Sequence, residues 1–153
     1  MNTRLTKTIV ISLVAVAMAF GMSDTTQANS QTPNCSAHTL RGLYVFSAHG
    51  WNIVGGVAQP KAIVEGIDFN GDGTLVVPFA TVSINGTIIR SGGSVVSFYT
   101  VEADCTGTLT FTGGPSFDIF VQPGEGDKVW MIQTGPAVAP PAVFEGTATK
   151  VSP

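Results

Sequence analysis

FYTVEADCTGTLTFT, the stretch from Phe98 to Thr112, reads as two β-strands joined by a turn at residues 104–107. After the turn, Leu109 and Phe111 alternate with threonines, so apolar and polar side chains point to opposite faces, as in a strand with one buried face. The turn also contains Cys105, one of two cysteines in the chain. We therefore predict that this β-hairpin is the element around which the rest of the chain is arranged.

The N-terminal residues predict an export signal. Residues 1–7 carry Arg4 and Lys7, and the apolar run at 8–22 is too short for a stable membrane span. Small residues stand at the positions that signal peptidase reads, so we expect cleavage after Ala28 and a secreted or periplasmic protein without a membrane span. The alternative, an uncleaved N-terminal anchor, is disfavoured because no charged stop-transfer pattern follows the apolar run.

The predicted organisation is a signal peptide at residues 1–28, an extended lead-in at 29–40 and a single domain at 41–153. Residues 29–153 are long enough to form one domain with a real core. They keep five basic and nine acidic side chains, a net charge of −4. Because the basic residues are scattered singly along the chain, we expect no nucleic-acid partner.

The composition is poor in charge. Charged residues make up 11% of the chain, against about 25% in an ordinary globular domain, and Thr, Ser and Gly are abundant. Small polar side chains and apolar atoms must therefore form much of the surface. This favours contact of part of the surface with a partner chain, and a homo-oligomer is one expected form.

Cys35 and Cys105 are the two thiols of the chain. An even number of cysteines in an exported protein favours one disulfide, which would stabilise the fold by roughly 4 kcal/mol in the chain-entropy model. A metal site is the poorer interpretation, because the cysteines are not closely spaced with each other or with His38 and His49. We expect neither a metal nor a cofactor.

Short strands separated by turn signals continue along the domain, and no segment has a helical period. The expected strands are 41–49, 61–69, 74–83, 87–90, 95–103, 106–112, 116–122, 127–133 and 143–151. Residues 51–60 are expected to form a glycine-rich connection, with a short irregular strand inside it as an alternative. Pro78 is expected to mark an edge or a bulge, because proline cannot donate to a ladder. The pattern predicts an all-β fold, an antiparallel barrel of about eight principal strands, with a two-sheet sandwich as the alternative.

Several short motifs carry a resemblance. They are Gly42-Leu43-Tyr44, the glycine-rich turn after Ile67-Asp68-Phe69, the hairpin from Tyr99 to Thr108, and Glu145-Gly146-Thr147-Ala148. The pattern resembles small secreted bacterial proteins whose barrel is similar in kind to calycin and allene-oxide-cyclase-like barrels. The resemblance implies the barrel fold and covers most of residues 29–153. Since its motifs are structural turns, it carries no catalytic residue over to this chain.

Residues 68–73, DFNGDG, have the spacing of the first half of an EF-hand calcium loop. The position that needs a bidentate glutamate is Phe79, and the flanking segments read as strands. We therefore expect a hairpin turn here, with a calcium site as the weaker alternative.

Few ionisable residues are candidates for chemistry. His38 and His49 are the two histidines, and neither lies in a motif that activates a nucleophile. The acidic residues that fall in or beside the expected strands are Glu65, Glu102, Asp118 and Glu145. A pair of them facing one lumen would form an acid–base pair, but the simpler expectation is the wet face of each strand.

Aromatic side chains within the expected strands are the candidate ligand-binding residues: Tyr44, Phe46, Tyr99, Phe117, Trp130 and Phe144. If they converge inside a barrel, they line a pocket for a small hydrophobic ligand. Core packing without a cavity explains them equally well.

Three functions follow from these observations. The first is a secreted barrel that binds a small hydrophobic ligand or forms an oligomer without chemistry of its own, and we favour a protein that is not an enzyme. The second is an isomerase or cyclase of the allene-oxide-cyclase-like kind, acting by conformational restriction in an apolar cavity. The third is a surface or matrix protein. The barrel interior discriminates among them, since a cavity with Glu or His beside aromatics favours catalysis and a filled core favours a structural role.

Overall fold

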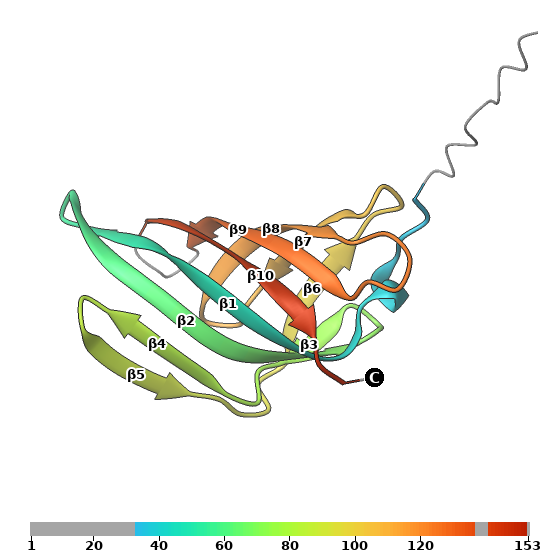
Figure 1. The fold of residues 1–153 in the computed structure, drawn as a ribbon, viewed down its shortest axis with the longest axis horizontal. Helices are drawn as coiled ribbons and strands as arrows, with labels where there is room; N and C mark the ends of the chain where they lie inside the picture. Colours follow the sequence, from blue (N-terminus) through green and yellow to red (C-terminus); the bar gives the residue numbers. More distant parts are fainter. Residues whose placement is uncertain (1–32, 137–140, 153) are drawn as a thin grey trace, which may run out of the picture. The chain divides into compact units, whose positions relative to one another are not determined.

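Ten strands form one antiparallel sheet in the computed structural model of the protein, which describes residues 33–136 and 141–152 (Figure 1). A short 3₁₀-helix, η1, precedes them at Ala37–Thr39. The strands are β1 Arg41–Val54, β2 Val57–Asn70, β3 Thr74–Val76, β4 Ala80–Ile84, β5 Thr87–Ser91, β6 Ser97–Val101, β7 Thr106–Thr110, β8 Pro115–Val121, β9 Lys128–Pro136 and β10 Ala142–Lys150. The predicted signal peptide at 1–28 lies outside the described residues.

The sheet closes into a barrel because β1 pairs on both sides, with β2 and with β10. The closed ring contains eight strands in the order β1-β10-β9-β8-β7-β6-β3-β2, and β4 and β5 lie outside it. Alternation places one face of each strand inside the ring, as where Tyr44 of β1 stands opposite Ile67 of β2, both fully buried. The predicted all-β antiparallel barrel is confirmed, and the alternative two-sheet sandwich is excluded.

The central hairpin also forms as predicted. Strands β6 and β7 pair with Tyr99 opposite Leu109, and both side chains are buried. The threonines that alternate with Leu109 along β7 are exposed. Two-residue alternation therefore located both the strands and the buried face correctly.

Two expected boundaries were wrong. Residues 51–60 form neither a connection nor a short irregular strand. The regular strands β1 and β2 continue through them, paired from Arg41↔Asn70 to Val54↔Val57, and turn at Gly55 and Gly56 with φ of 58° and 80°. The expected strand at 74–83 is split into β3 and β4 by residues 77–79. Pro78 stands in this break, because it has no N–H with which to continue the ladder.

The break at Pro78 changes which strand pairs with β2. Residues 68 and 69 of β2 pair with β3, whereas residues 61–65 pair with β4. At the change, the Gly66 amide donates to the Phe79 carbonyl oxygen over 2.9 Å. The hairpin of β4 and β5, called the flap below, therefore extends from the outer part of β2 beside the barrel (Figure 1).

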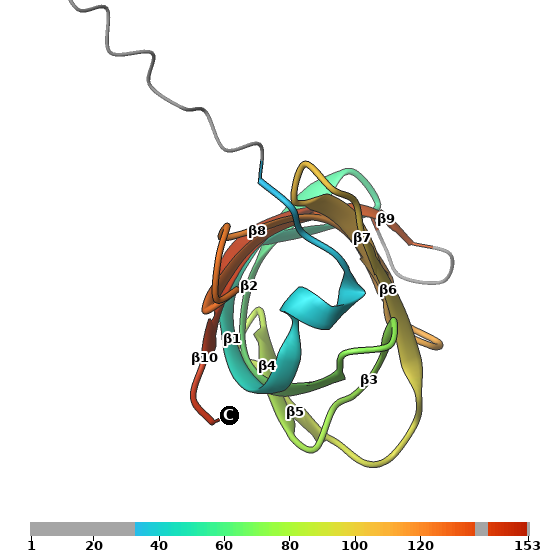
Figure 2. The ribbon, with the colours of Figure 1, turned by 90° about the vertical axis from the view of Figure 1, so that its right-hand side faces the viewer.

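One end of the barrel is closed by the segment that precedes β1, and Figure 2 shows η1 across that end. Cys35 is joined to Cys105 with a Cα–Cα distance of 5.0 Å. The Tyr99 hydroxyl donates to the carbonyl oxygens of Ala37 and Leu40 at 2.9 and 3.1 Å. The expected extended lead-in is thus a 3₁₀ turn where it meets the barrel, and the predicted disulfide fastens it.

Aromatic side chains fill the interior beneath this closed end. Tyr44 packs edge-on against Phe69, and Phe69 against Tyr99, with ring centroids 5.1 and 4.9 Å apart. The Tyr44 hydroxyl donates to the Gly126 carbonyl oxygen over 2.8 Å. Burial, with a smaller contribution from the charge of Asp127, raises the pKa of Tyr44 to about 12. Tyr44 therefore acts in this structure as a buried hydrogen-bond donor.

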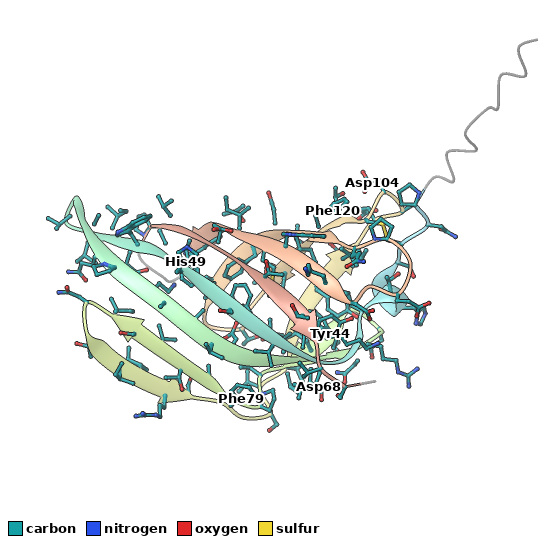
Figure 3. The ribbon with its side chains drawn as sticks, in the orientation of Figure 1. Tyr44, His49, Asp68, Phe79, Asp104 and Phe120 are labelled. Carbon is teal, nitrogen blue, oxygen red and sulfur yellow. A yellow bond between two sulfur atoms is a disulfide. The ribbon has the colours of Figure 1, made fainter. Side chains whose placement is uncertain are left out.

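The outer wall carries exposed apolar side chains, as the low charge content predicted. Phe120 and Trp130 stand opposite each other on β8 and β9, with ring centroids 6.0 Å apart, and Figure 3 shows Phe120 on the outside of this wall. Exposed Ile132 and Val143 continue the apolar surface across β9 and β10. The described residues contain no helix long and apolar enough to cross a bilayer.

Candidate functional site

A pocket of about 480 Å³ opens into the barrel beside the flap. Its walls come from the flap, from β1, β2, β8 and β10, from the start of β6, and from the segments that follow β3, β5 and β7. The pocket exists because the flap extends from β2 without pairing with β6, whose ladder to β3 consists of Thr74↔Phe98 and Leu75↔Ser97. The lumen is therefore filled at the closed end and accessible beside the flap.

The pocket wall is mainly apolar. Phe46, Phe117 and Phe144 form its deep, buried part, and Phe46 packs edge-on against both other rings at 5.8 and 6.4 Å. Val82 and Ile89 contribute the flap side. A concave apolar wall of this size with a few polar groups is the usual form of a small-molecule site.

Three polar side chains of the β1–β2 hairpin enter this apolar surface: Asn52, Lys61 and Glu65. Lys61 and Glu65 are four residues apart on β2, so strand alternation gives them the same face. Asn52 belongs to the lumen-facing row of β1 that includes Phe46 and is only 6% exposed. The hairpin therefore supplies an amide, an ammonium and a carboxyl group to one pocket.

Glu65 is a buried carboxyl group, 6% exposed, in a largely apolar environment. Burial raises its pKa to about 7, and the positive charge of Lys61 opposes that shift without overcoming it. Among the described residues, no hydrogen bond to the Glu65 carboxyl oxygens is found. Every side-chain polar atom there that is sealed from solvent has a hydrogen-bond partner, so the Glu65 oxygens are not sealed but face the pocket. The Glu65 carboxyl group is therefore available to a molecule in the pocket.

Lys61 is held between an aromatic ring and an amide. Its Nζ lies 4.0 Å from the centroid of the Phe144 ring and donates to Gln133 Oε1 over a long 3.5 Å. Burial lowers the pKa of Lys61, and the charge of Glu65 works in the opposite direction. The ring and the amide orient the ammonium group, but neither carries a compensating negative charge.

The structure brings together three of the aromatic side chains predicted to bind a ligand. Phe46, Phe117 and Phe144 line the pocket. Tyr44 and Tyr99 are packed at the closed end. Trp130 is on the outer wall, 45% exposed, where Phe120 and Lys128 are its neighbours.

The four acidic candidates are likewise divided between the lumen and the outer surface. Glu65 faces the lumen, where its charged neighbour is a lysine and not a second carboxylate. Glu102, Asp118 and Glu145 are exposed, so the wet-face expectation holds for these three but was wrong for Glu65. The structure therefore forms no lumenal carboxylate pair from these four residues.

The histidines lie away from the pocket. His38 is exposed in η1, and His49 is exposed on the outer face of β1 opposite Glu145 (Figure 3). In residues 33–136 and 141–152, no cluster of three or more His, Cys, Asp or Glu side chains could hold a metal ion.

The segment at 68–73 forms the predicted turn between β2 and β3. The Asp72 carboxylate accepts hydrogen bonds from the Thr74 backbone amide at 2.9 Å and from the Thr74 hydroxyl at 2.6 Å. These hydrogen bonds lower the pKa of Asp72. Asp104 and Thr106 repeat the same arrangement at the β6–β7 turn, with distances of 3.0 and 2.6 Å. Both aspartates thus have a structural role in closing a hairpin.

Sequence reasoning missed Lys61 and Asn52 as site residues. The signal was present for Lys61, because it shares the two-residue period of Ile63, Glu65 and Ile67. Asn52 could not be found in this way, since its segment was interpreted as a loop. The flap was also missed, because it depends on the split of the strand at Pro78.

A scan against protein-family models finds no match to this chain, and a search of curated proteins finds none either. Of the resemblance described above, the structure supports the fold, an eight-stranded antiparallel barrel. The disulfide indicates an oxidising, extracytoplasmic compartment.

Proposed function

We propose that this protein binds a small, largely apolar molecule in the pocket beside the flap. The observation that carries this proposal is the pocket itself: about 480 Å³ of space against buried phenylalanines, with Asn52, Lys61 and Glu65 converging on it. A structural protein gains no stability from placing an ammonium and a carboxyl group beside an unfilled apolar cavity, because both groups lose hydration there. A ligand that fills the space and meets the polar groups offsets that cost.

Titration with the neutral apolar fluorophore N-phenyl-1-naphthylamine tests this function. We expect saturable binding with one site per chain. Val82→Trp, on the pocket wall of the flap, should weaken binding by at least about tenfold by filling the site. Val64→Trp is the matched control, because Val64 is exposed on the opposite face of β2. Absence of saturable binding, or equal loss in both variants, would contradict the proposal.

A second candidate function is acid–base catalysis of an isomerisation or cyclisation in the same pocket. The observation that favours it is Glu65, a buried carboxyl group beside aromatic rings with a pKa near neutrality. Such a group can both accept and return a proton at physiological pH. In the isomerisation of a β,γ-unsaturated ketone, Glu65 as carboxylate would take the α-proton and return it to the γ-carbon of the dienolate, with no net change in the protein.

Ultraviolet absorbance of the conjugated product measures that reaction with a β,γ-unsaturated ketone as probe. Catalysis requires that Glu65→Gln abolish turnover while binding of the neutral fluorophore is retained. Glu145→Gln, on the outer wall, is the control and should leave turnover unchanged. If wild type and Glu65→Gln both convert the ketone at the uncatalysed rate, this second candidate function is contradicted.

The expected homo-oligomer stays a prediction, and the exposed Phe120–Trp130 pair is the surface that supports it. Sedimentation velocity of wild type and Trp130→Ser tests it. A dimer that dissociates in the variant supports association through this wall, and a wild-type monomer at high concentration contradicts it.

A further inference from the structure

The proposed function leaves the charge of the ligand open, and the inference here rests on that function. Of the residues that line the pocket, Lys61 and Glu65 are the ionisable ones, and both come from β2. The other polar lining residues, among them Asn52 on β1, Ser91 at the end of β5 and Ser97 on β6, carry no charge. The net charge of the pocket therefore depends on these two groups alone.

Lys61 lacks a full counter-charge in the described structure. Its ammonium group is placed over the Phe144 ring and makes one long hydrogen bond to Gln133, so donor capacity remains for a group in the pocket. A cation held in a partly desolvated site is unfavourable unless an anion or several strong acceptors approach it. The geometry presents this group along the wall that the ligand must touch.

Glu65 does not neutralise that charge under mildly acidic conditions. It lies opposite Phe46 in the β1–β2 ladder, deeper in the barrel than Lys61, among buried apolar side chains. Burial favours its protonated form up to a pH of about 7, as its raised pKa shows. Below that pH the pocket carries one positive charge and, at Glu65, a neutral carboxyl group that can donate as well as accept.

We propose that the pocket takes a monoanionic ligand, an apolar molecule ending in a carboxylate, with the carboxylate paired with Lys61 and the apolar body against Phe46, Phe117 and Phe144. The pairing supplies the counter-charge that Lys61 lacks. A cationic ligand would face Lys61 directly, and a neutral one would leave its ammonium group uncompensated. Ionisation of Glu65 would make the pocket neutral overall and weaken binding of the anion.

Competition against bound N-phenyl-1-naphthylamine at pH 6.5 tests the charge preference, with decanoate, decanol and decylamine as probes of equal chain length below their micelle concentrations. We expect decanoate to compete best and decylamine worst, with at least about a tenfold difference in affinity between them. Lys61→Met keeps the apolar stem and should weaken decanoate about tenfold while leaving decanol unchanged. Lys61→Arg, which keeps the charge, should retain most of the decanoate affinity.

The outcomes separate this inference from the proposed function. If the fluorophore binds and all three probes compete equally, or if Lys61→Met weakens decanol as much as decanoate, the anion preference is wrong and the apolar site stands. If the fluorophore itself does not bind, the proposed function fails. Because the fluorophore is neutral and does not need the Lys61 charge, retained fluorophore affinity in Lys61→Met confirms that the variant is folded.

A pH series tests the part played by Glu65. Decanoate affinity should fall as the pH rises from 6.5 to 8.5 in wild type, because Glu65 becomes ionised in that interval, and should change less in Glu65→Gln. Equal pH dependence in the two proteins would show that Glu65 is not the protonated partner, and would overturn that part of the proposal.

Discussion

Glu65 lies directly opposite Phe46 in the β1–β2 ladder, and both side chains line the pocket beside the flap. This pairing places a carboxyl group on the barrel interior next to a ring that itself packs against Phe117 and Phe144. The environment removes hydration from the carboxylate, and the part of the chain that the structure describes supplies no hydrogen bond to it. Its raised pKa is the direct consequence, and it makes the stability of the protein depend on pH.

The wild-type protein should lose stability as the pH rises from 4.5 to about 7, and Glu65→Gln should abolish this loss. In that window the folded protein keeps the Glu65 proton and the unfolded chain releases it, so the free energy of unfolding falls as the pH rises. The loss is on the order of 3 kcal/mol, complete above pH 7 and absent below the unfolded pKa. Urea unfolding at several pH values measures it.

Glu145→Gln is the matched control for that experiment, because Glu145 is exposed on the outer wall. It should reproduce the wild-type pH profile. If Glu65→Gln also keeps the wild-type profile, the side chain is not desolvated as the structure indicates.

Replacing both cysteines by serine should lower the free energy of unfolding by about 4 kcal/mol, because the bond between Cys35 and Cys105 closes a loop with a sequence separation of 70. Urea unfolding checks the magnitude. A reducing agent should destabilise the wild type by a similar amount and leave the double variant unaffected. Equal stability of the oxidised and reduced wild type would contradict the prediction.

Tyr99→Phe should lower the free energy of unfolding by about 1–2 kcal/mol, because the Leu40 carbonyl loses its hydroxyl donor and the Ala37 carbonyl keeps only the Leu40 amide. The change should also loosen η1 against the barrel end. Hydrogen exchange should therefore become faster at the Leu40 amide, which donates to the Ala37 carbonyl. Amides of the β8–β9 ladder, which the hydroxyl does not touch, serve as the internal control and should keep their rates.

Gly66→Ala should destabilise the protein by about 1–3 kcal/mol, because a Cβ at this position would lie 2.6 Å from the Phe79 ring. Phe79 is partly exposed, and its ring covers Gly66 at the point where the pairing partner of β2 changes from β3 to β4. In a Phe79→Ala background the same substitution should cost clearly less. A double-mutant cycle measures the coupling, and additive effects would show that the contact does not hold the flap.

Local patterns predicted the elements whose sequence alternates without interruption. β6, β7 and the turn between them follow from Leu109, Phe111 and the intervening threonines, and the disulfide from the two cysteines of an exported chain. The β1–β2 hairpin was less readable, because its glycines at 50, 55 and 56 and Pro60 look like a loop while the backbone remains paired through Pro60↔Trp51. Here the long ladder to a neighbouring strand overrides the local propensity.

The sequence by itself determined an all-β antiparallel chain, the crosslink and the outward threonine faces, because these depend on a two-residue period and on the chemistry of turns and thiols. It favoured a barrel but left a two-sheet sandwich as the alternative. Only the tertiary structure decided that β1 pairs on both sides, that β4 and β5 leave the ring, and that the resulting pocket receives Lys61 and Glu65. Which strands become neighbours, and so which side chains share a lumen, is set by contacts between residues far apart in the chain. Alternation fixes the face of a side chain but not what stands across from it.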